Sequence, residues 1–243
     1  FLGDEAKGIL SHARPAKNGE ILPYGKAGGS IWYGDLMFKD QNGDGIIDES
    51  DQTYLGSPIP LFQIGFNNSV TFKNFDLNIF FSGSYGNKIY NKIRINTENP
   101  RANLSYFSSM KDYAKLALVD PEGSDSDVNN VYVVNADTKI HGVRNDDTNG
   151  HTRTSDRYIE DGSCLKCKSV TLGYRFSEHL LRKANISSLR VYASVTNLFT
   201  ITNYSGLDPE IGSWNPRNAG VDSGYYPQPR IFTFGVNLSL SNK

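Results

Sequence analysis

Five segments of the chain alternate apolar and polar residues, which is the period of two that a β-strand produces. They span residues 61–73, 75–86, 164–176, 188–199 and 230–240. In the first segment, one face carries aromatic and aliphatic side chains, namely Phe62, Ile64, Phe66, Val70 and Phe72. Because successive side chains of a strand point to opposite faces, each segment predicts a strand with one apolar and one polar face.

The connections between these segments are of two kinds. Two are short, at 73–76 and 177–187, and two are long, at 87–163 and 200–229. Short turns on one side and long loops on the other are typical of an antiparallel transmembrane β-barrel, whose strands need roughly 9–11 tilted residues to cross the apolar layer. A soluble β-sandwich also has alternating strands, although usually shorter ones, and is the alternative all-β fold.

The pattern divides the chain into two regions. Residues 1–60 are irregular and glycine-rich and end in an acidic stretch, which indicates a loop region. Residues 61–243 hold the predicted barrel strands and two long loops, at 88–157 and 200–229. A loop as long as the first points to a functional segment, and its sequence MKDYAKLAL at 110–118 predicts a short helix.

The acidic segment 40–51, DQNGDGIIDESD, has the spacing of a calcium-binding loop, with Gly45 where the chain must turn sharply. The expected ligands are the side chains of Asp40, Asn42, Asp44, Asp48 and Asp51 and the backbone carbonyl of Ile46. A solvated acidic turn is the simpler alternative. Because the flanking sequences look extended rather than helical, we expect a structural calcium ion rather than a regulatory EF-hand.

Charge and composition exclude several classes of protein. Lys and Arg number 25 against 26 Asp and Glu, so the chain lacks the concentrated positive field that binding to nucleic acid needs. No stretch approaches 18 consecutive apolar residues, which excludes a transmembrane helix. The two cysteines, Cys164 and Cys167, would point to opposite faces of a strand, too far apart for a disulfide, and are expected to be structural thiols.

No catalytic signature is present in the sequence. The patterns GxSxG and HExxH and a glycine-rich phosphate loop are missing, and the four histidines are scattered through polar segments. Three aromatic residues in the loop 200–229 could stack on a sugar, although ordinary loop packing is the simpler reading: Trp214, Tyr225 and Tyr226. We therefore expect a protein that is not an enzyme.

Several stretches resemble the C-terminal part of SusC/RagA-type TonB-dependent outer-membrane transporters. They are the run from GDLMFKDQNGDG to SGSYGNKIYN, then YIEDGSCLKCKSVTLGY, SSLRVYASVTNLFTITNYSGLDPEIG and YPQPRIFTFGVNLSL. The resemblance covers most of 30–92, 158–211 and 226–240, whereas 1–29 and 93–157 carry little of it. Cys164 and Cys167 stand where the family usually has an aromatic and a leucine-like residue.

The resemblance implies a plugged barrel of about 22 strands in the outer membrane of Bacteroidetes-like bacteria. It also implies nutrient uptake: a SusD-like surface lipoprotein closes over the barrel, TonB supplies energy through an N-terminal plug, and the substrates are oligosaccharides or peptides. The loops 88–157 and 200–229 would then contact the lipoprotein or the substrate.

Five strands cannot close a barrel, and unpaired strand edges are prohibitive in lipid. We therefore expect this chain to be a fragment, or one of several chains that form one barrel, completed by the remaining barrel and plug segments of the same transporter. If the C-terminus is periplasmic, both short links are periplasmic and both long loops and the calcium loop lie outside. The alternative function is a secreted calcium-binding module, either dockerin-like or a carbohydrate-binding β-sandwich.

Overall fold

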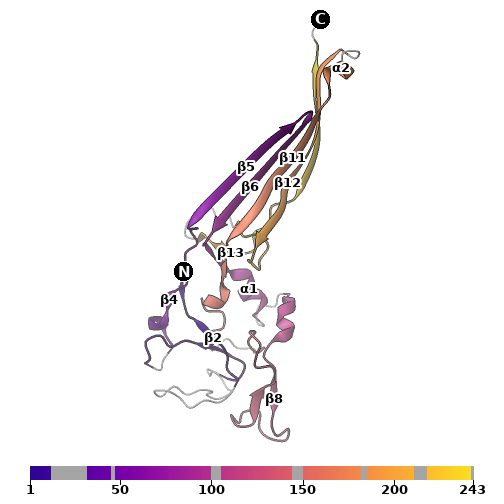
Figure 1. The fold of residues 1–243 in the computed structure, drawn as a ribbon. Coiled ribbons are helices and arrows are strands. Elements are labelled where there is room, and N and C mark those ends of the chain that lie inside the picture. Colours follow the sequence, from indigo (N-terminus) through magenta and orange to yellow (C-terminus); the bar gives the residue numbers. More distant parts are fainter. Residues whose placement is uncertain are drawn as a thin grey trace. The chain divides into compact units, whose positions relative to one another are not determined.

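A five-stranded antiparallel sheet contains all the segments that alternate in the sequence (Figure 1). The computed structural model describes residues 1–11, 32–44, 47–99, 105–143, 150–181, 185–210 and 218–241. The strands of the sheet, in chain order, are β5 (Phe62–Phe72), β6 (Phe75–Tyr85), β11 (Cys164–Arg175), β12 (Ile186–Thr202) and β14 (Ile231–Leu240). Their spatial order is β14-β12-β11-β6-β5, so the five predicted strands are confirmed.

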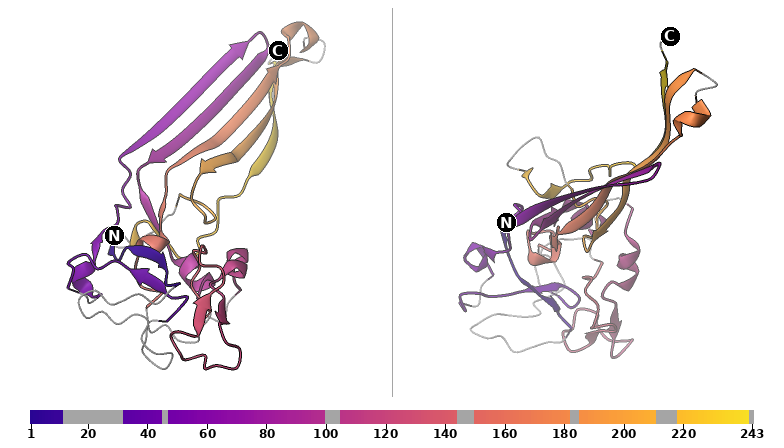
Figure 2. Two further views of the ribbon diagram at one scale, coloured as in Figure 1. Left: turned by 60° about the horizontal axis from the view of Figure 1, so that its bottom comes forward. Right: turned by 45° about the horizontal axis from the view of Figure 1, so that its top comes forward.

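The register of the sheet collects the apolar residues on one face. Val70 pairs with Leu77, which pairs with Leu172, and the row continues through Ala193 to Phe234. Directly paired residues of neighbouring strands point to the same side of a sheet, so this row crosses all five strands on one face. The strands lie side by side and twist together in both views of Figure 2.

Neither face of this sheet is covered in the way that a β-sandwich requires. Every residue of β5 is exposed, on the apolar and the polar side alike. Among the described residues, no second sheet packs against the five strands to bury their apolar face. The arrangement fits a barrel wall, which has lipid on one side and a lumen on the other. No helix in the described ranges is both long and apolar enough to span a bilayer.

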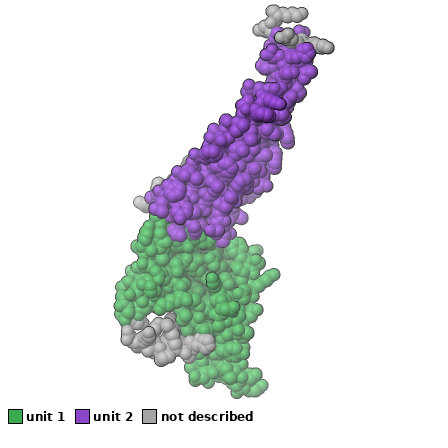
Figure 3. Space-filling model, viewed as in Figure 1, with its two compact units in different colours: residues 1–57, 90–160, 221–223 green, residues 58–89, 161–220, 224–243 purple. Residues whose placement is uncertain are grey.

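The chain forms two compact units, coloured separately in Figure 3. Unit 1 comprises residues 1–57, 90–160 and 221–223, and unit 2 comprises residues 58–89, 161–220 and 224–243. Unit 2 holds the five-stranded sheet and the short helix α2 (Glu178–Leu181). The two predicted loop regions, 1–60 and 88–157, thus contribute most of one compact unit.

Unit 1 is built from short elements. Its strands include β1 (Leu2–Gly3), β2 (Ala6–Ile9), β3 (Leu36–Phe38), β4 (Thr53–Tyr54), β8 (Leu116–Leu118) and β9 (Val131–Val133). The helices in the described part of this unit are α1 (Lys92–Thr97) and three 3₁₀ helices, Glu49–Asp51, Ser108–Asp112 and Asp156–Tyr158. Near the unit boundaries lie β7 (Lys88–Asn91), β10 (Ile159–Asp161) and β13 (Val221–Asp222).

A hydrophobic core holds unit 1 together, although the sequence shows no long apolar pattern there. The cluster consists of Ile9, Trp32, Tyr33, Leu36, Phe38, Ala114, Val131 and Val133. These residues come from short strands and loops that are distant in the sequence, so each segment supplies only a few of them. The core explains why a polar segment of this length can be ordered.

The predicted helix at 110–118 is wrong. A 3₁₀ helix covers Ser108–Asp112, and the chain then enters the strand β8. Leu116 and Leu118 pair with Val133 and Val131 of β9. Local helix preference is weak, and here the cross-strand contacts outweigh it.

Candidate functional site

Polar side chains form rows across the polar face of the sheet, near the start of β5 and the end of β12. One row of register pairs reads Gln63, Ser84, Cys164 and Thr202. The next row reads Gly65, Ser82, Lys166 and Thr200. In a barrel wall this is the face that lines the lumen.

A pocket of about 650 Å³ opens beside these rows. Its polar lining includes Gln63, Ser82, Ser84, Asn87 and Glu210. The volume lies within the roughly 300–1,000 Å³ that is usual for small-molecule sites. Amide and hydroxyl groups both donate and accept hydrogen bonds, so the pocket is suited to a neutral polar ligand such as a sugar or a peptide backbone.

Two lysines of β11 hold the segment after β12 at this pocket. The Nζ atom of Lys166 lies 2.5 Å from Oδ1 of Asp208 and 2.9 Å from Oε2 of Glu210. Lys168 also donates to Glu210. Lys168 is the extra residue of a β-bulge between Cys167 and Ser169, and bulges characteristically re-aim side chains.

The ion cluster keeps both carboxylates charged. Burial by itself would raise the pKa of Asp208 and of Glu210, but the hydrogen bonds from the lysines lower the pKa of both below the usual value. Lys166 is 4% exposed, so this pairing occurs largely out of water. The cluster therefore fixes the segment that carries Glu210 into the pocket lining.

A second ion pair lies toward the other end of the polar face. The Nε atom of Arg190 donates to Oδ1 of Asp76 over 2.9 Å, and its Nη2 donates to Oδ2. Arg175 lies 3.9 Å from the same carboxylate. The polar face thus has fixed charges near both ends, which the sequence analysis did not select. Their signal in the sequence was the presence of charged residues in strands whose polar face is otherwise neutral, one each in β6 and β12 and three in β11.

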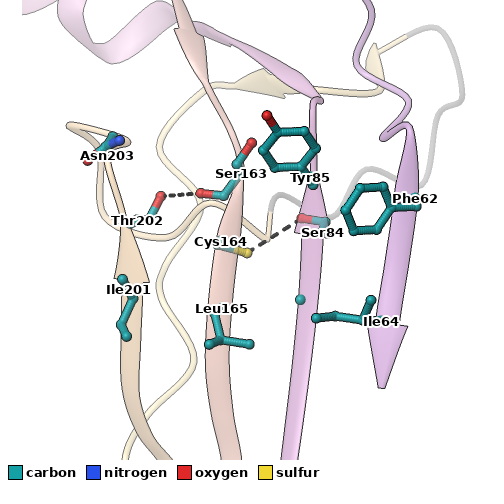
Figure 4. A pocket seen from close by; sticks show the side chains of 11 residues that line it. Phe62, Ile64, Ser84, Tyr85, Ser163, Cys164, Leu165, Ile201, Thr202 and Asn203 are labelled. Atoms are coloured by element: carbon teal, nitrogen blue, oxygen red, sulfur yellow. Dashed lines mark hydrogen bonds between the residues drawn. The ribbon is translucent and has the colours of Figure 1, made fainter. Parts of the chain in front are cut away.

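The apolar face has a hollow of about 360 Å³ at the same end of the sheet as the polar pocket. Figure 4 shows Phe62, Ile64, Leu165 and Ile201 around it. The rings of Phe62 and Tyr85 stack with their centroids 5.3 Å apart. Aromatic residues at strand ends are typical of the girdles that barrels place at the membrane surface.

The expected calcium loop is partly visible. Oδ1 of Asp40 accepts the backbone N–H of Gly43 over 2.6 Å, and Oδ1 of Asn42 accepts that of Asp44 over 2.9 Å. These bonds curl the loop at its first positions. Gly45 and Ile46 lie outside the described residues, so the predicted carbonyl ligand of Ile46 cannot be placed.

Asp51 fastens the end of this loop to its beginning. It is fully buried, and its two oxygens accept the backbone N–H groups of Gln41 and Asp48, over 2.7 and 2.9 Å. The bond from Asp48 lowers the pKa of Asp51 most. Asp48 in turn caps the 3₁₀ helix Glu49–Asp51 by accepting the N–H of Ser50. Within the described part of the chain, no three His, Cys, Asp or Glu side chains gather as a metal-ligand set. The calcium ion remains a prediction.

The two cysteines take the positions that the sequence predicted. Cys164 pairs with Ser84 on the polar face, Cys167 pairs with Phe81 on the apolar face, and both are buried free thiols. Of the aromatic residues considered for sugar stacking, Tyr226 is 89% exposed and Tyr225 is 41% exposed. Trp214 lies outside the described residues.

Two of the scattered histidines meet inside unit 1. The rings of His141 and His151 have their centroids 4.3 Å apart, and Nε2 of His151 lies 3.3 Å from Oδ1 of Asp35. Burial, and then the neighbouring His151, lower the pKa of His141 to about 4. The two histidines are therefore buried structural residues of unit 1.

Comparison with known proteins identifies the family of the chain. It is 33% identical over 99% of its length to TonB-dependent receptor P3 of Formosa agariphila. It is 29% identical over 84% of its length to TonB-dependent receptor SusC of Bacteroides thetaiotaomicron. The chain spans 22% of the first relative and 17% of the second. No family model matches it.

Solved structures show the same fold. The structure of the RagAB peptide importer in its closed-closed state superposes with a TM-score of 0.65 over 98% of this chain and 22% of that chain, at 20% identity. The open-open state of the same importer gives a TM-score of 0.61 over 99% of this chain. The five-stranded sheet therefore has the fold of a section of a β-barrel wall.

Proposed function

This chain belongs to the SusC-type TonB-dependent receptors, which are β-barrel proteins of the outer membrane, and we propose that it forms part of the wall of a nutrient importer. The observation that carries this proposal is the sheet with one apolar and one hollowed polar face. The apolar face would contact lipid, and the polar face would line the path of the substrate.

The proposed substrates are oligosaccharides or peptides. The polar pocket supports this class because its amide and hydroxyl groups match sugar hydroxyls and peptide backbones equally well. The similar RagAB structure is described as a peptide importer, which supports the peptide half of the proposal. The named relatives are receptors and importers, and we propose a transport role rather than a catalytic one.

The proposed partners are a SusD-like surface lipoprotein, TonB, and the remaining barrel and plug segments. Dependence on TonB is supported by the names of the similar receptors. The described residues of the long segment 88–157 support a docking role because most of them belong to a compact unit. Its hairpin of β8 and β9 exposes Tyr132 and Val134, which are 43% and 59% exposed.

The transport proposal can be tested by filling the polar pocket. In the full-length transporter, Ser82→Trp should lower ligand uptake about tenfold or more, because the indole occupies the space that the ligand needs. The matched control is Ser69→Trp, on the polar face of β5 but away from the pocket. Outer-membrane abundance is measured for both. Equal uptake by the two variants would show that this pocket is not part of the transport path.

We also propose that the loop 40–51 binds one calcium ion with a structural role. The curled backbone at Asp40 and Asn42 supports it, since this is how a calcium loop turns its oxygens inward. Calcium should raise the thermal unfolding temperature of the purified transporter, and Asp44→Ala should abolish the increase. Asp127→Ala, in another exposed loop, should retain it. An increase that survives Asp44→Ala would place the ion elsewhere.

A further inference from the structure

A pocket in unit 1 has four cationic side chains among its eight lining residues. It has a volume of about 370 Å³ and is formed by segments of β2, β3, α1 and the 3₁₀ helix Asp156–Tyr158. Its charged lining consists of Lys7, Arg94, Lys139, Arg157 and Asp156. A carboxylate with its carbon stem needs only a fraction of this space, since one water takes roughly 30 Å³.

The two arginines are held in place by one buried carboxylate. Oε1 of Glu98 accepts Nε of Arg94 over 2.7 Å, and Oε2 accepts Nη2 of Arg157 over 2.7 Å. Glu98 is 1% exposed. Arg94 also donates to the backbone carbonyl of Arg157 over 3.0 Å. These bonds fix both guanidinium groups before any ligand arrives, which lowers the entropic cost of binding.

Arg157 has a buried donor without a partner. Its side chain is 7% exposed, and its Nε–H has no hydrogen-bond partner among the described residues. Leaving a charged donor unpaired and out of water carries a desolvation cost that no hydrogen bond offsets. A ligand oxygen in the pocket would remove this cost, so the pocket favours an acceptor.

A β-bulge in β2 positions the side chain of Lys7. The pairing of β2 with β3 shifts between Ala6 and Gly8, so Lys7 is the extra residue of a β-bulge. Gly8 has φ +126°, and a Cβ there would meet no atom within 4 Å. The bulge therefore places an exposed lysine beside open space, as bulges near binding sites often do.

The single acid of the lining is already engaged. Oδ1 of Asp156 accepts the backbone N–H of Ala6 over 2.8 Å. The four cations of the lining are surrounded by three carboxylates: Asp156, Glu98 and Glu160, which lies 3.6 Å from Arg94. The net charge of these seven groups is therefore +1, which matches a singly charged carboxylate better than a doubly charged phosphate.

From this geometry we propose that the pocket binds a carboxylate of an acidic ligand. The carboxylate would accept from Nε–H of Arg157 and from the ammonium groups of Lys7 and Lys139, in charge-assisted bonds. The inference deepens the proposed function, because it gives unit 1 a subsite for acidic nutrients. Two sources share this chemistry: acidic side chains of peptides and uronic acids of oligosaccharides.

The test measures binding to the purified full-length transporter by calorimetry. The probes are triglutamate against triglutamine, and a trigalacturonate against a neutral trigalactose. The variant is Lys7→Gln combined with Lys139→Gln, which leaves the bonds of Glu98 intact. The control is Lys92→Gln combined with Lys111→Gln, which removes the same charge from exposed positions outside the pocket.

At least one acidic probe should bind more tightly than its neutral counterpart, and the pocket variant should lose about tenfold or more of that affinity. The control should stay within about twofold, because distant surface charges are screened by salt. Whichever acid binds identifies the source of the carboxylate. The proposal is overturned if neither acid binds, if the control loses as much, or if sulfate displaces the acid at equal concentration. Because binding is read without transport, a failure of uptake would count against the proposed function alone.

Discussion

Asp76 of β6 and Arg190 of β12 form a bidentate ion pair across the strand that separates them. They meet over Gly173 of β11, which pairs with Asp76 on one side and with Tyr192 on the other. A Cβ atom at position 173 would lie 2.5 Å from Nη2 of Arg190 and 2.6 Å from Oδ2 of Asp76. The glycine is therefore required by the close approach of the two charges.

Gly173→Val should break this ion pair. The added side chain occupies the place where the two charges meet, so we expect a loss of about 1–3 kcal/mol of stability. Thermal unfolding of the full-length protein in detergent measures it. Gly65→Val is the control, because a Cβ there meets only Phe80, at an ordinary 3.7 Å. Equal stability of the two variants would show that the ion pair does not depend on Gly173.

A new charge should destabilise the protein far more on the apolar face of β5 than on its polar face. Phe66 and Asn67 are neighbours in the chain, but Phe66 pairs with Phe81 on the apolar face and Asn67 lies on the polar face. Phe66→Arg places a charge in lipid and should cost about 2–4 kcal/mol, whereas Asn67→Arg should cost much less. Folding equilibria in lipid vesicles measure both. A larger loss for Asn67→Arg would invert the assignment of the faces.

Lys166 should anchor the segment that carries Asp208 and Glu210. Lys166→Met leaves both carboxylates partly buried without this cation, and breaking such a pair costs about 3 kcal/mol. Hydrogen exchange of residues 203–210 should become faster while β6 stays protected. Lys73→Met, at the exposed hairpin turn, is the control. Unchanged exchange of 203–210 would mean that other contacts hold the segment.

Unit 1 should lose stability in mild acid through His141. The groups facing its ring include His151, Arg157 and Glu98, and Asp35 lies beyond His151. The pKa of His141 falls from 6.5 in the unfolded chain to about 4 in the folded one. The neutral form therefore stabilises the fold above pH 6.5, and this contribution disappears as the pH falls from 6.5 to about 4.

The expected loss is at most about 3 kcal/mol, because each pKa unit corresponds to about 1.4 kcal/mol. Hydrogen exchange in β3 and β9, measured from pH 7.5 to pH 4.5 and corrected for intrinsic rates, follows it. His141→Phe should flatten the dependence, and His179→Phe, at an exposed position of α2, should leave it unchanged. A dependence that persists in His141→Phe would assign it to other groups.

The sequence by itself determined the five strands and the face on which each side chain lies. A strand's period of two is local, so Phe62 and Ile64 fall on one face and Gln63 on the other whatever the rest of the chain does. The placement of Cys164 and Cys167 on opposite faces follows from the same rule. The long alternating segments favoured a barrel wall but left a β-sandwich open, and the exposure of both faces of β5 argues against the sandwich.

Only the tertiary structure decided which distant residues meet. The core of unit 1 brings Trp32 together with Ala114 and Val133. Each segment supplies too few apolar residues to form a periodic pattern that would predict this core. The helix expected at 110–118 gave way to pairing between β8 and β9 for the same reason. The ion pair of Asp76 with Arg190 depends on strand register. The hydrogen bonds of Glu98 with Arg94 and Arg157 depend on chain packing. Periodicity records the environment of each residue but not its partners, because partners are set by contacts across long stretches of chain.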